Sequence, residues 1–261
     1  MKRTKEELAE AFMLGEFPRS AKYDAGWVIE NLMGPNVLWL TESLIQVMDL
    51  EPGMRVLDMG CGRAISSIFL AKELDVQVWA ADLWIEASDN LERIRDAGVE
   101  NQVFPVHAEA RSLPFAHNFF DAIVSMDSYH YYGTDDLYLG GHFARLVKPE
   151  GQIGIVVPGL TRELPSADPP EHLQPSWYGD FWSFHSPDWW RRHWERSGVV
   201  TVELADMIPD GWKHWITSAE IAAEWRGGQS DEAGYVRLDA GRTLGFTRMV
   251  ARRRKDMLWR G

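Results

Sequence analysis

The chain has 261 residues, 45% hydrophobic and 25% charged, which is the composition of an ordinary folded globular protein. This excludes collagen-like, low-complexity and intrinsically disordered chains, and the length favours one large α/β domain over two independent domains. The formal charge of −12 argues against a nucleic-acid partner, because phosphate backbones are bound mainly through clustered lysines and arginines.

The sequence also bears on location and partners. No run approaches the ~18 to 20 apolar residues of a membrane helix, and the charged N-terminus lacks the apolar run of an export signal. The single cysteine, Cys61, excludes an internal disulfide and a cysteine-built metal site. We therefore expect a cytoplasmic protein without a membrane partner, and the sequence leaves a homo-oligomer open.

The predicted elements alternate over the first 157 residues. Two helices come first, one capped by Thr4 with Glu7 three residues on, the other following Gly34-Pro35 and running to Met48. Strands are then predicted over residues 55–59, 77–83, 103–107, 120–126 and 152–157, and helices over residues 64–73, 87–97 and 135–147. This alternation is typical of a parallel sheet covered on both faces.

The alternation is interrupted after residue 157. Residues 158–175 contain five prolines, which predicts a stiff, ordered excursion over the sheet edge. Beyond it we expect a helix over residues 186–198, a strand over 199–205, a helix over 212–225 and a last strand over 244–251. The chain is thus predicted to form a seven-stranded, mostly parallel, Rossmann-like doubly wound sheet whose last strand is antiparallel.

A glycine loop follows the first predicted strand. Gly60 and Gly62 permit positive φ angles and a close approach of the backbone to a ligand, although an ordinary tight turn would also use them. Asp82 ends the second predicted strand, 22 residues after Gly60, where a doubly wound sheet places an acid against a ribose diol. The combination favours a nucleoside cofactor.

Two nucleoside cofactors are compatible with this loop. A nicotinamide dinucleotide would favour glycine or alanine where the chain has Ile65, and the carboxylate of Asp58 is unfavourable beside a pyrophosphate. Asp58 suits a ligand with a positive amino group and no phosphate, such as S-adenosylmethionine, or it only ties the loop amides together. The nicotinamide dinucleotide remains the less favoured alternative.

Three blocks in residues 54–158 resemble the class I S-adenosylmethionine-dependent methyltransferases, particularly the small-molecule branch typified by ubiquinone and menaquinone biosynthesis enzymes. Val56-Leu57-Asp58-Met59-Gly60-Cys61-Gly62 is similar to the motif that holds the methionine moiety, Ala80-Ala81-Asp82-Leu83-Trp84 to the ribose and adenine motif, and residues 108–115 to the adenine-edge block. Arg63 in place of a third glycine and Glu109 in place of aspartate are mild departures. The resemblance implies cofactor contacts from nine residues: Asp58, Gly60, Cys61, Gly62, Asp82, Leu83, Glu109, Ala110 and Met126.

The resemblance implies methyl transfer from S-adenosylmethionine to a small molecule by in-line displacement. The alternatives are a protein that binds the cofactor without methylating and, less favoured, a nicotinamide oxidoreductase. One domain is expected, with an N-terminal helical cap (1–53), a cofactor-binding core (54–158), an acceptor-side insertion (159–198) and C-terminal strands and helix (199–261).

The loop after the fourth strand, residues 127–133, is where acceptor-facing residues are expected. His130 is the first candidate for a base and Tyr129 the second, although the cluster could be an aromatic packing platform without proton transfer. Asp127 and His130 could contribute to a metal site, but local spacing supplies too few ligands, and no metal is expected.

Aromatic residues concentrate beyond the prolines, since eight of the 13 tryptophans lie between residues 177 and 225. As a group, Trp177, Trp182 and His185 suit a flat or cationic acceptor, although the same residues could be the core under an insertion. Tyr23, with Trp27 beside it, is predicted to close the other side of the pocket.

Overall fold

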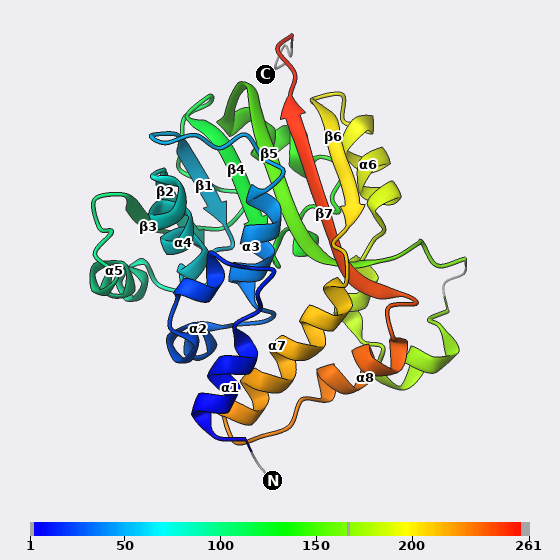
Figure 1. The fold of residues 1–261 in the computed structure, drawn as a ribbon. Helices are drawn as coiled ribbons and strands as arrows, with labels where there is room; N and C mark the ends of the chain where they lie inside the picture. Colours follow the sequence, from blue (N-terminus) through cyan, green and yellow to red (C-terminus); the bar gives the residue numbers. More distant parts are fainter. Residues whose placement is uncertain (1–2, 166–167, 257–261) are drawn as a thin grey trace.

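The computed structural model describes residues 3–165 and 168–256, and its centre is a seven-stranded sheet in the order β3-β2-β1-β4-β5-β7-β6 (Figure 1). Neighbouring strands from β3 to β5 are parallel, and β7 is antiparallel to both β5 and β6. The strands are β1 (Arg55–Met59), β2 (Gln77–Asp82), β3 (Val103–His107), β4 (Phe120–Met126), β5 (Val147–Leu160), β6 (Val200–Met207) and β7 (Leu244–Arg253). The predicted fold, with its last strand antiparallel, is confirmed.

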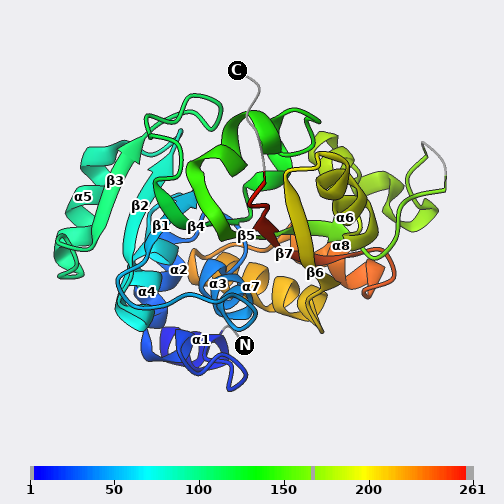
Figure 2. The same ribbon diagram turned by 90° about the horizontal axis from the view of Figure 1, so that it is seen from above.

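Eight α-helices occur in the part of the chain that the structure describes. They are α1 (Lys5–Phe12), α2 (Ala25–Asn31), α3 (Val37–Ile45), α4 (Ile65–Leu74), α5 (Ala87–Asp96), α6 (Pro187–Arg196), α7 (Gly211–Trp225) and α8 (Asp231–Asp239). Seen from above, α3, α4 and α7 lie on one side of the sheet, and α6 with the segment between β4 and β5 lies on the other (Figure 2). The sheet is therefore covered on both faces.

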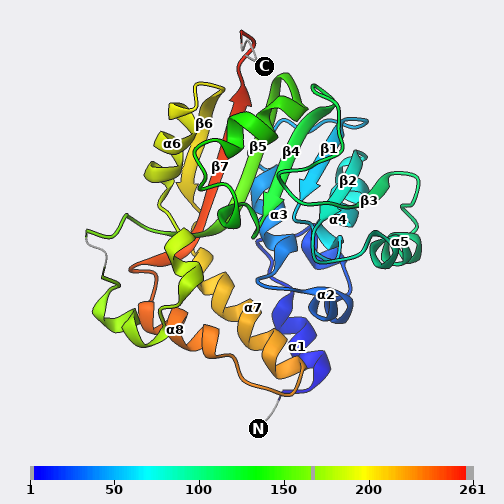
Figure 3. The ribbon, with the colours of Figure 1, turned by 180° about the vertical axis from the view of Figure 1, so that it is seen from behind.

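Helices from the two ends of the chain form a cap beneath the carboxyl ends of the parallel strands (Figures 1 and 3). Leu8, Phe12 and Ile29 pack with Ile221 and Ala222 in one buried apolar cluster that joins α1 and α2 to α7. The cap lies at the sheet edge where open α/β folds bind ligands.

Two short helices were not predicted. In α2, the Asp24 carboxylate accepts the Trp27 N–H at 2.7 Å, and in α8, the Ser230 hydroxyl accepts the Ala233 N–H at 3.1 Å. Both helices depend on an N-cap and on packing in the cap rather than on a long apolar repeat.

The predicted helix over residues 135–147 is wrong. The chain there forms a π-helical turn, Leu139–Phe143, and a 3₁₀ turn, Ala144–Leu146. Gly140 and Gly141 weaken a regular helix, and burial of Tyr138 and Phe143 fixes the irregular backbone instead.

The predicted proline-rich excursion begins later than expected. Strand β5 starts at Val147 and continues through Pro158, which pairs with Phe246 of the antiparallel β7, to Leu160. Beyond it the chain forms two 3₁₀ segments, η5 (Glu171–Ser176) and η6 (Gly179–Ser183).

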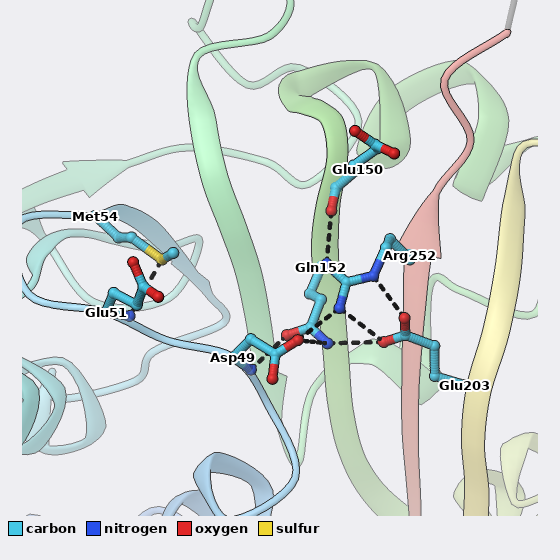
Figure 4. A network of polar contacts seen from close by, with 7 residues as sticks. All are labelled: Asp49, Glu51, Met54, Glu150, Gln152, Glu203 and Arg252. Carbon is cyan, nitrogen blue, oxygen red and sulfur yellow. Dashed lines mark hydrogen bonds and ion pairs between the residues drawn. The ribbon is translucent and has the colours of Figure 1, made fainter.

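A polar network fastens the strands at the edge opposite the cap (Figure 4). Arg252 of β7 contacts Asp49 at 2.6 Å and Glu203 of β6 at 2.5 Å, and its Nη1 donates to the carbonyl of Glu150 at 2.8 Å. The Gln152 amide donates to Glu203 at 2.7 Å and accepts the Asp49 N–H at 2.7 Å. These contacts fix the antiparallel strands far from the ligand edge.

Candidate cofactor and acceptor site

A cavity of about 300 Å³ opens at the carboxyl ends of β1, β2 and β4, a size suited to a small ligand. It is bounded by the glycine loop, the ends of β2 and β4, and the loop between α2 and α3. The lining residues are Asn31, Met33, Gly34, Pro35, Val37, Met59, Gly60, Cys61, Gly62, Arg63, Ile65, Asp82, Leu83, Trp84, Glu109, Ala110, Arg111, Met126, Asp127, Ser128, Tyr131 and Tyr132.

The glycine loop is held close to the loop that follows β4. Gly60 and Gly62 have φ angles of +74° and +53°, a region that favours glycine. A Cβ on Gly60 would lie 1.9 Å from the Oγ of Ser128, so no larger residue fits without displacing that loop. The backbone amides of Gly60 and Cys61 both donate to the Ala81 carbonyl, at 2.8 and 3.1 Å.

Asp82 links the glycine loop to the turn after β2. Its Oδ2 accepts the Gly62 N–H at 2.8 Å, and its Oδ1 accepts the N–H groups of Trp84 and Ile85 at 2.7 and 3.0 Å. A carboxylate oxygen has two acceptor positions, so Oδ2 retains one for a ligand hydroxyl. The residue therefore fits the ribose-binding role implied by the resemblance.

Two other side chains hold the cavity wall in place. The buried Asn90 amide of α5 donates to the Gly62 carbonyl at 2.9 Å. Arg93, also of α5, donates from Nε to Asn31 at 3.1 Å and thereby binds the end of α2 over the cavity. The N-terminal segment thus forms part of the site.

Eight of the nine predicted cofactor residues line this cavity, and Asp58 is the exception. Asp58 is fully buried, and its Oδ2 accepts the hydroxyls of Ser66 and Ser67 at 2.6 and 2.7 Å. Burial raises the pKa of its carboxyl to about 6. The carboxylate lies beneath the loop and anchors the first turn of α4, so Asp58 is outside the cavity wall where the predicted contact with an amino group would be made.

The two predicted catalytic residues do not line the cavity, which disagrees with the predicted base. Tyr129 is completely buried between Trp190 and Trp194, each with a ring centroid 5.6 Å away, and it is a core residue. His130 is 1% exposed and packs against Tyr131 and Phe184. Burial lowers the pKa of His130 to about 3, which leaves it a poor base at neutral pH.

The four predicted acceptor residues also lie outside the cavity lining. The side chains of Trp177 and Trp182 contact each other, and Trp182 is 51% exposed. His185 stacks on Trp189 at 3.6 Å and its Nδ1 lies 3.1 Å from Glu163. Tyr23 donates to Glu73 at 3.5 Å. The local density of aromatic residues therefore indicated side chains that pack against one another, and not the wall of the cavity.

The sequence reasoning missed the lining residues that come from outside the motifs. Met33, Gly34 and Pro35 cover the cavity from the N-terminal side, and the signal that the sequence offers there is a Gly-Pro turn before a helix. Asp127 and Tyr131 lie in the loop that was singled out, on either side of the residues that were chosen. A rule preferring the residue directly after the strand would have found Asp127.

Comparisons with known proteins agree with this geometry. Residues 56–151 match the family model described as a methyltransferase domain. The match covers the part of the sheet that carries the glycine loop and Asp82, which is less than half of the chain. The predicted resemblance to methyltransferases is thereby confirmed for this region.

Two curated relatives cover the same region. The chain is 30% identical over 135 residues to methyltransferase GfsG of Streptomyces halstedii, covering 49% of this chain and 47% of the relative. It is 34% identical over 109 residues to the demethylmenaquinone methyltransferase of Corynebacterium efficiens, covering 41% and 43%. The matches thus span a little under half the length of each relative.

The fold likeness extends over the whole chain. The crystal structure of the [4+2]-cyclase SpnF superposes with a TM-score of 0.69 at 16% identity, covering 97% of this chain and 98% of that one. Identity this low shows the fold alone, and the same fold can support different chemistry.

Two further findings concern the described residues 3–165 and 168–256. None of their helices has the length and apolar character needed to cross a membrane. Within the same ranges, no group of three or more His, Cys, Asp and Glu side chains is arranged to hold a metal ion.

Proposed function

We propose that the chain binds S-adenosylmethionine in this cavity and transfers its methyl group to a small-molecule acceptor. The observation that carries the proposal is the convergence of the motif residues: the glycine loop, Asp82 and the block after β3 line one cavity in a methyltransferase domain. The cofactor would supply a methyl carbon already activated by a sulfonium. The protein then has to bind the cofactor and the acceptor, align them for the transfer, and exclude water.

Each part of the wall has a role in this proposal. Asp82 would accept a ribose hydroxyl through Oδ2, and Leu83, Ala110 and Met126 give the apolar surface on which an adenine ring would lie. The glycine loop, whose amides at Gly60, Cys61 and Gly62 are taken by Ala81 and Asp82, would pass beside the methionine part. Asp127, Ser128 and Tyr131 lie on the acceptor side of the same cavity.

The proposal is tested by calorimetry with S-adenosylmethionine and S-adenosylhomocysteine. We expect Asp82→Ala to lower the affinity for both ligands by about tenfold or more, since hydrogen bonds to a charged carboxylate contribute roughly 1.5 to 3 kcal/mol. Asp96→Ala, an exposed carboxylate at the end of α5, is the control and should bind like the wild type. Unchanged affinity in Asp82→Ala would contradict the ribose assignment.

The two alternatives give different results. A nicotinamide oxidoreductase would bind reduced nicotinamide dinucleotide with a change in its fluorescence and would ignore S-adenosylhomocysteine. A protein that binds the cofactor without methylating would bind S-adenosylhomocysteine tightly and leave every acceptor unmodified.

A further inference from the structure

Asp127 follows β4 directly and lies in the cavity wall. Its backbone is fixed, because its N–H donates to the Val156 carbonyl at 2.8 Å, and its φ of +52° is unusual for a residue other than glycine. Within residues 3–165 and 168–256, its carboxylate accepts no hydrogen bond and forms no ion pair. Backbone strain and unpaired polar groups of this kind concentrate at functional sites.

The N-terminal segment closes directly on this carboxylate. A Cβ on Gly34 would lie 2.4 Å from the Oδ2 of Asp127, so the glycine backbone passes against the acid. Both residues line the cavity. The acid is therefore confined on one side and faces the ligand space on the other.

The charges around Asp127 are negative. Burial raises the pKa of its carboxyl to about 8, and the negative charge of Glu232 in α8 adds to the effect. Burial raises the pKa of the neighbouring Tyr131 to about 12, and the negative charges of Asp127, Asp180 and Glu232 add to the effect. Carboxylates from three separate segments thus act on one end of the cavity.

The two arginines in the cavity wall already have protein partners. Arg63 donates from Nη1 to the Glu30 carbonyl at 2.7 Å, and Arg111 contacts Glu109 at 3.4 Å. Aromatic faces are available instead, since Tyr131 and Trp84 are 51% and 71% exposed with ring centroids 6.2 Å apart. A carboxylate beside exposed aromatic rings is the chemistry that binds an organic cation.

We infer that Asp127 binds the methyl acceptor and that this acceptor is an amine that enters as its ammonium ion. The inference rests on the proposed function and names its substrate class. Because the site without an amine holds the proton of Asp127 at neutral pH, that proton leaves to solvent as the ammonium binds. The resulting carboxylate takes one proton from the bound ammonium, and the freed nitrogen lone pair forms the new N–C bond. As the methyl C–S bond breaks, its electron pair stays on sulfur, and the product leaves as a methylated ammonium. Atoms and charge balance without a further reactant.

The test uses the full chain saturated with S-adenosylhomocysteine and measures binding by calorimetry. The probes are ethylamine and benzylamine, each matched with its alcohol, ethanol or benzyl alcohol. We expect at least one amine to bind at least tenfold more tightly than its alcohol. Asp127→Asn should remove that preference while S-adenosylhomocysteine affinity stays within twofold of the wild type.

Two controls keep the result specific. Asp135→Asn alters an exposed carboxylate of the same loop, and the new amide oxygen can still accept the Leu137 N–H, so the amine preference should persist. Gly34→Ala leaves the Asp127 carboxylate in place but adds a methyl group against it, and should weaken binding of the same amine.

The outcomes separate the two proposals. Failure of S-adenosylhomocysteine to bind the wild type would overturn the proposed function. If that ligand binds but neither amine is preferred over its alcohol, or if the preference survives in Asp127→Asn, the amine inference is overturned and the cofactor proposal stands.

Discussion

The proposed cofactor side and the proposed acceptor side of the cavity differ in how their walls are built. Gly60, Gly62 and Asp82 lie within one β-α-β segment, and the ends of parallel strands bring them together. The acceptor side combines the α2–α3 loop with the loop after β4, and carboxylates of η6 and α8 stand behind it. A continuous motif therefore specifies the first wall, whereas tertiary packing of distant segments specifies the second.

The largest effect that would sharpen this comparison is expected at Gly60. Gly60→Ala places a Cβ against Ser128 at a positive φ, so we expect S-adenosylhomocysteine affinity to fall by about a hundredfold. Gly98→Ala is the matched control, because Gly98 also has a positive φ, +70°, with nothing within 4 Å of the added Cβ. Both variants should lose roughly 1 to 2 kcal/mol of stability from the backbone. Calorimetry and thermal melts separate the two effects, and equal loss of affinity in both would show that the contact with Ser128 is unimportant.

A smaller effect, on stability, is expected on the acceptor side. The folded-state pKa of Asp127 is raised to about 8, whereas an unfolded aspartate titrates near ~3.9. The folded protein therefore holds the proton more tightly, and stability falls as pH rises from about 4 to about 8. Asp127→Asn removes this loss, so its stability relative to the wild type should increase over that range by about 2 kcal/mol, less than the full pKa difference because the site is partly solvated.

Denaturant unfolding at pH 4, 6 and 8 measures this difference. Asp135→Asn, in the same loop but exposed, should show a constant difference from the wild type at all three values. A constant difference in Asp127→Asn as well would mean that its carboxyl has an ordinary pKa and that the negative surroundings are unimportant.

The sequence predicted the two walls unequally for a physical reason. Strand periodicity and the glycine loop are local, so β1, β3 and β4 were predicted with their observed bounds. The resemblance then named the residues proposed to bind the cofactor, and eight of these nine line the cavity. Asp58 was misassigned because the sequence does not show that Ser66 and Ser67, one turn into α4, take its carboxylate. The acceptor side depends on the short α2 and α8, which are stabilised by packing in the cap, and their positions have no local signature.

The smallest effect is expected at His130, the residue that sequence position alone would favour as a base. Its ring is buried against Phe184 and Tyr131, and burial lowers its pKa to about 3, so it is neutral throughout the range from pH 5 to 8. We expect its imidazole signals in nuclear magnetic resonance spectra to stay constant over that range. His130→Asn should change S-adenosylhomocysteine affinity by less than twofold, because the side chain is absent from the cavity wall. With an acceptor in hand, the variant should also keep the pH dependence of turnover, since a group that does not titrate cannot contribute a limb to the profile. A midpoint between pH 5 and 8 that disappears in the variant would restore His130 as the base and would place the acceptor deeper in the fold than Asp127.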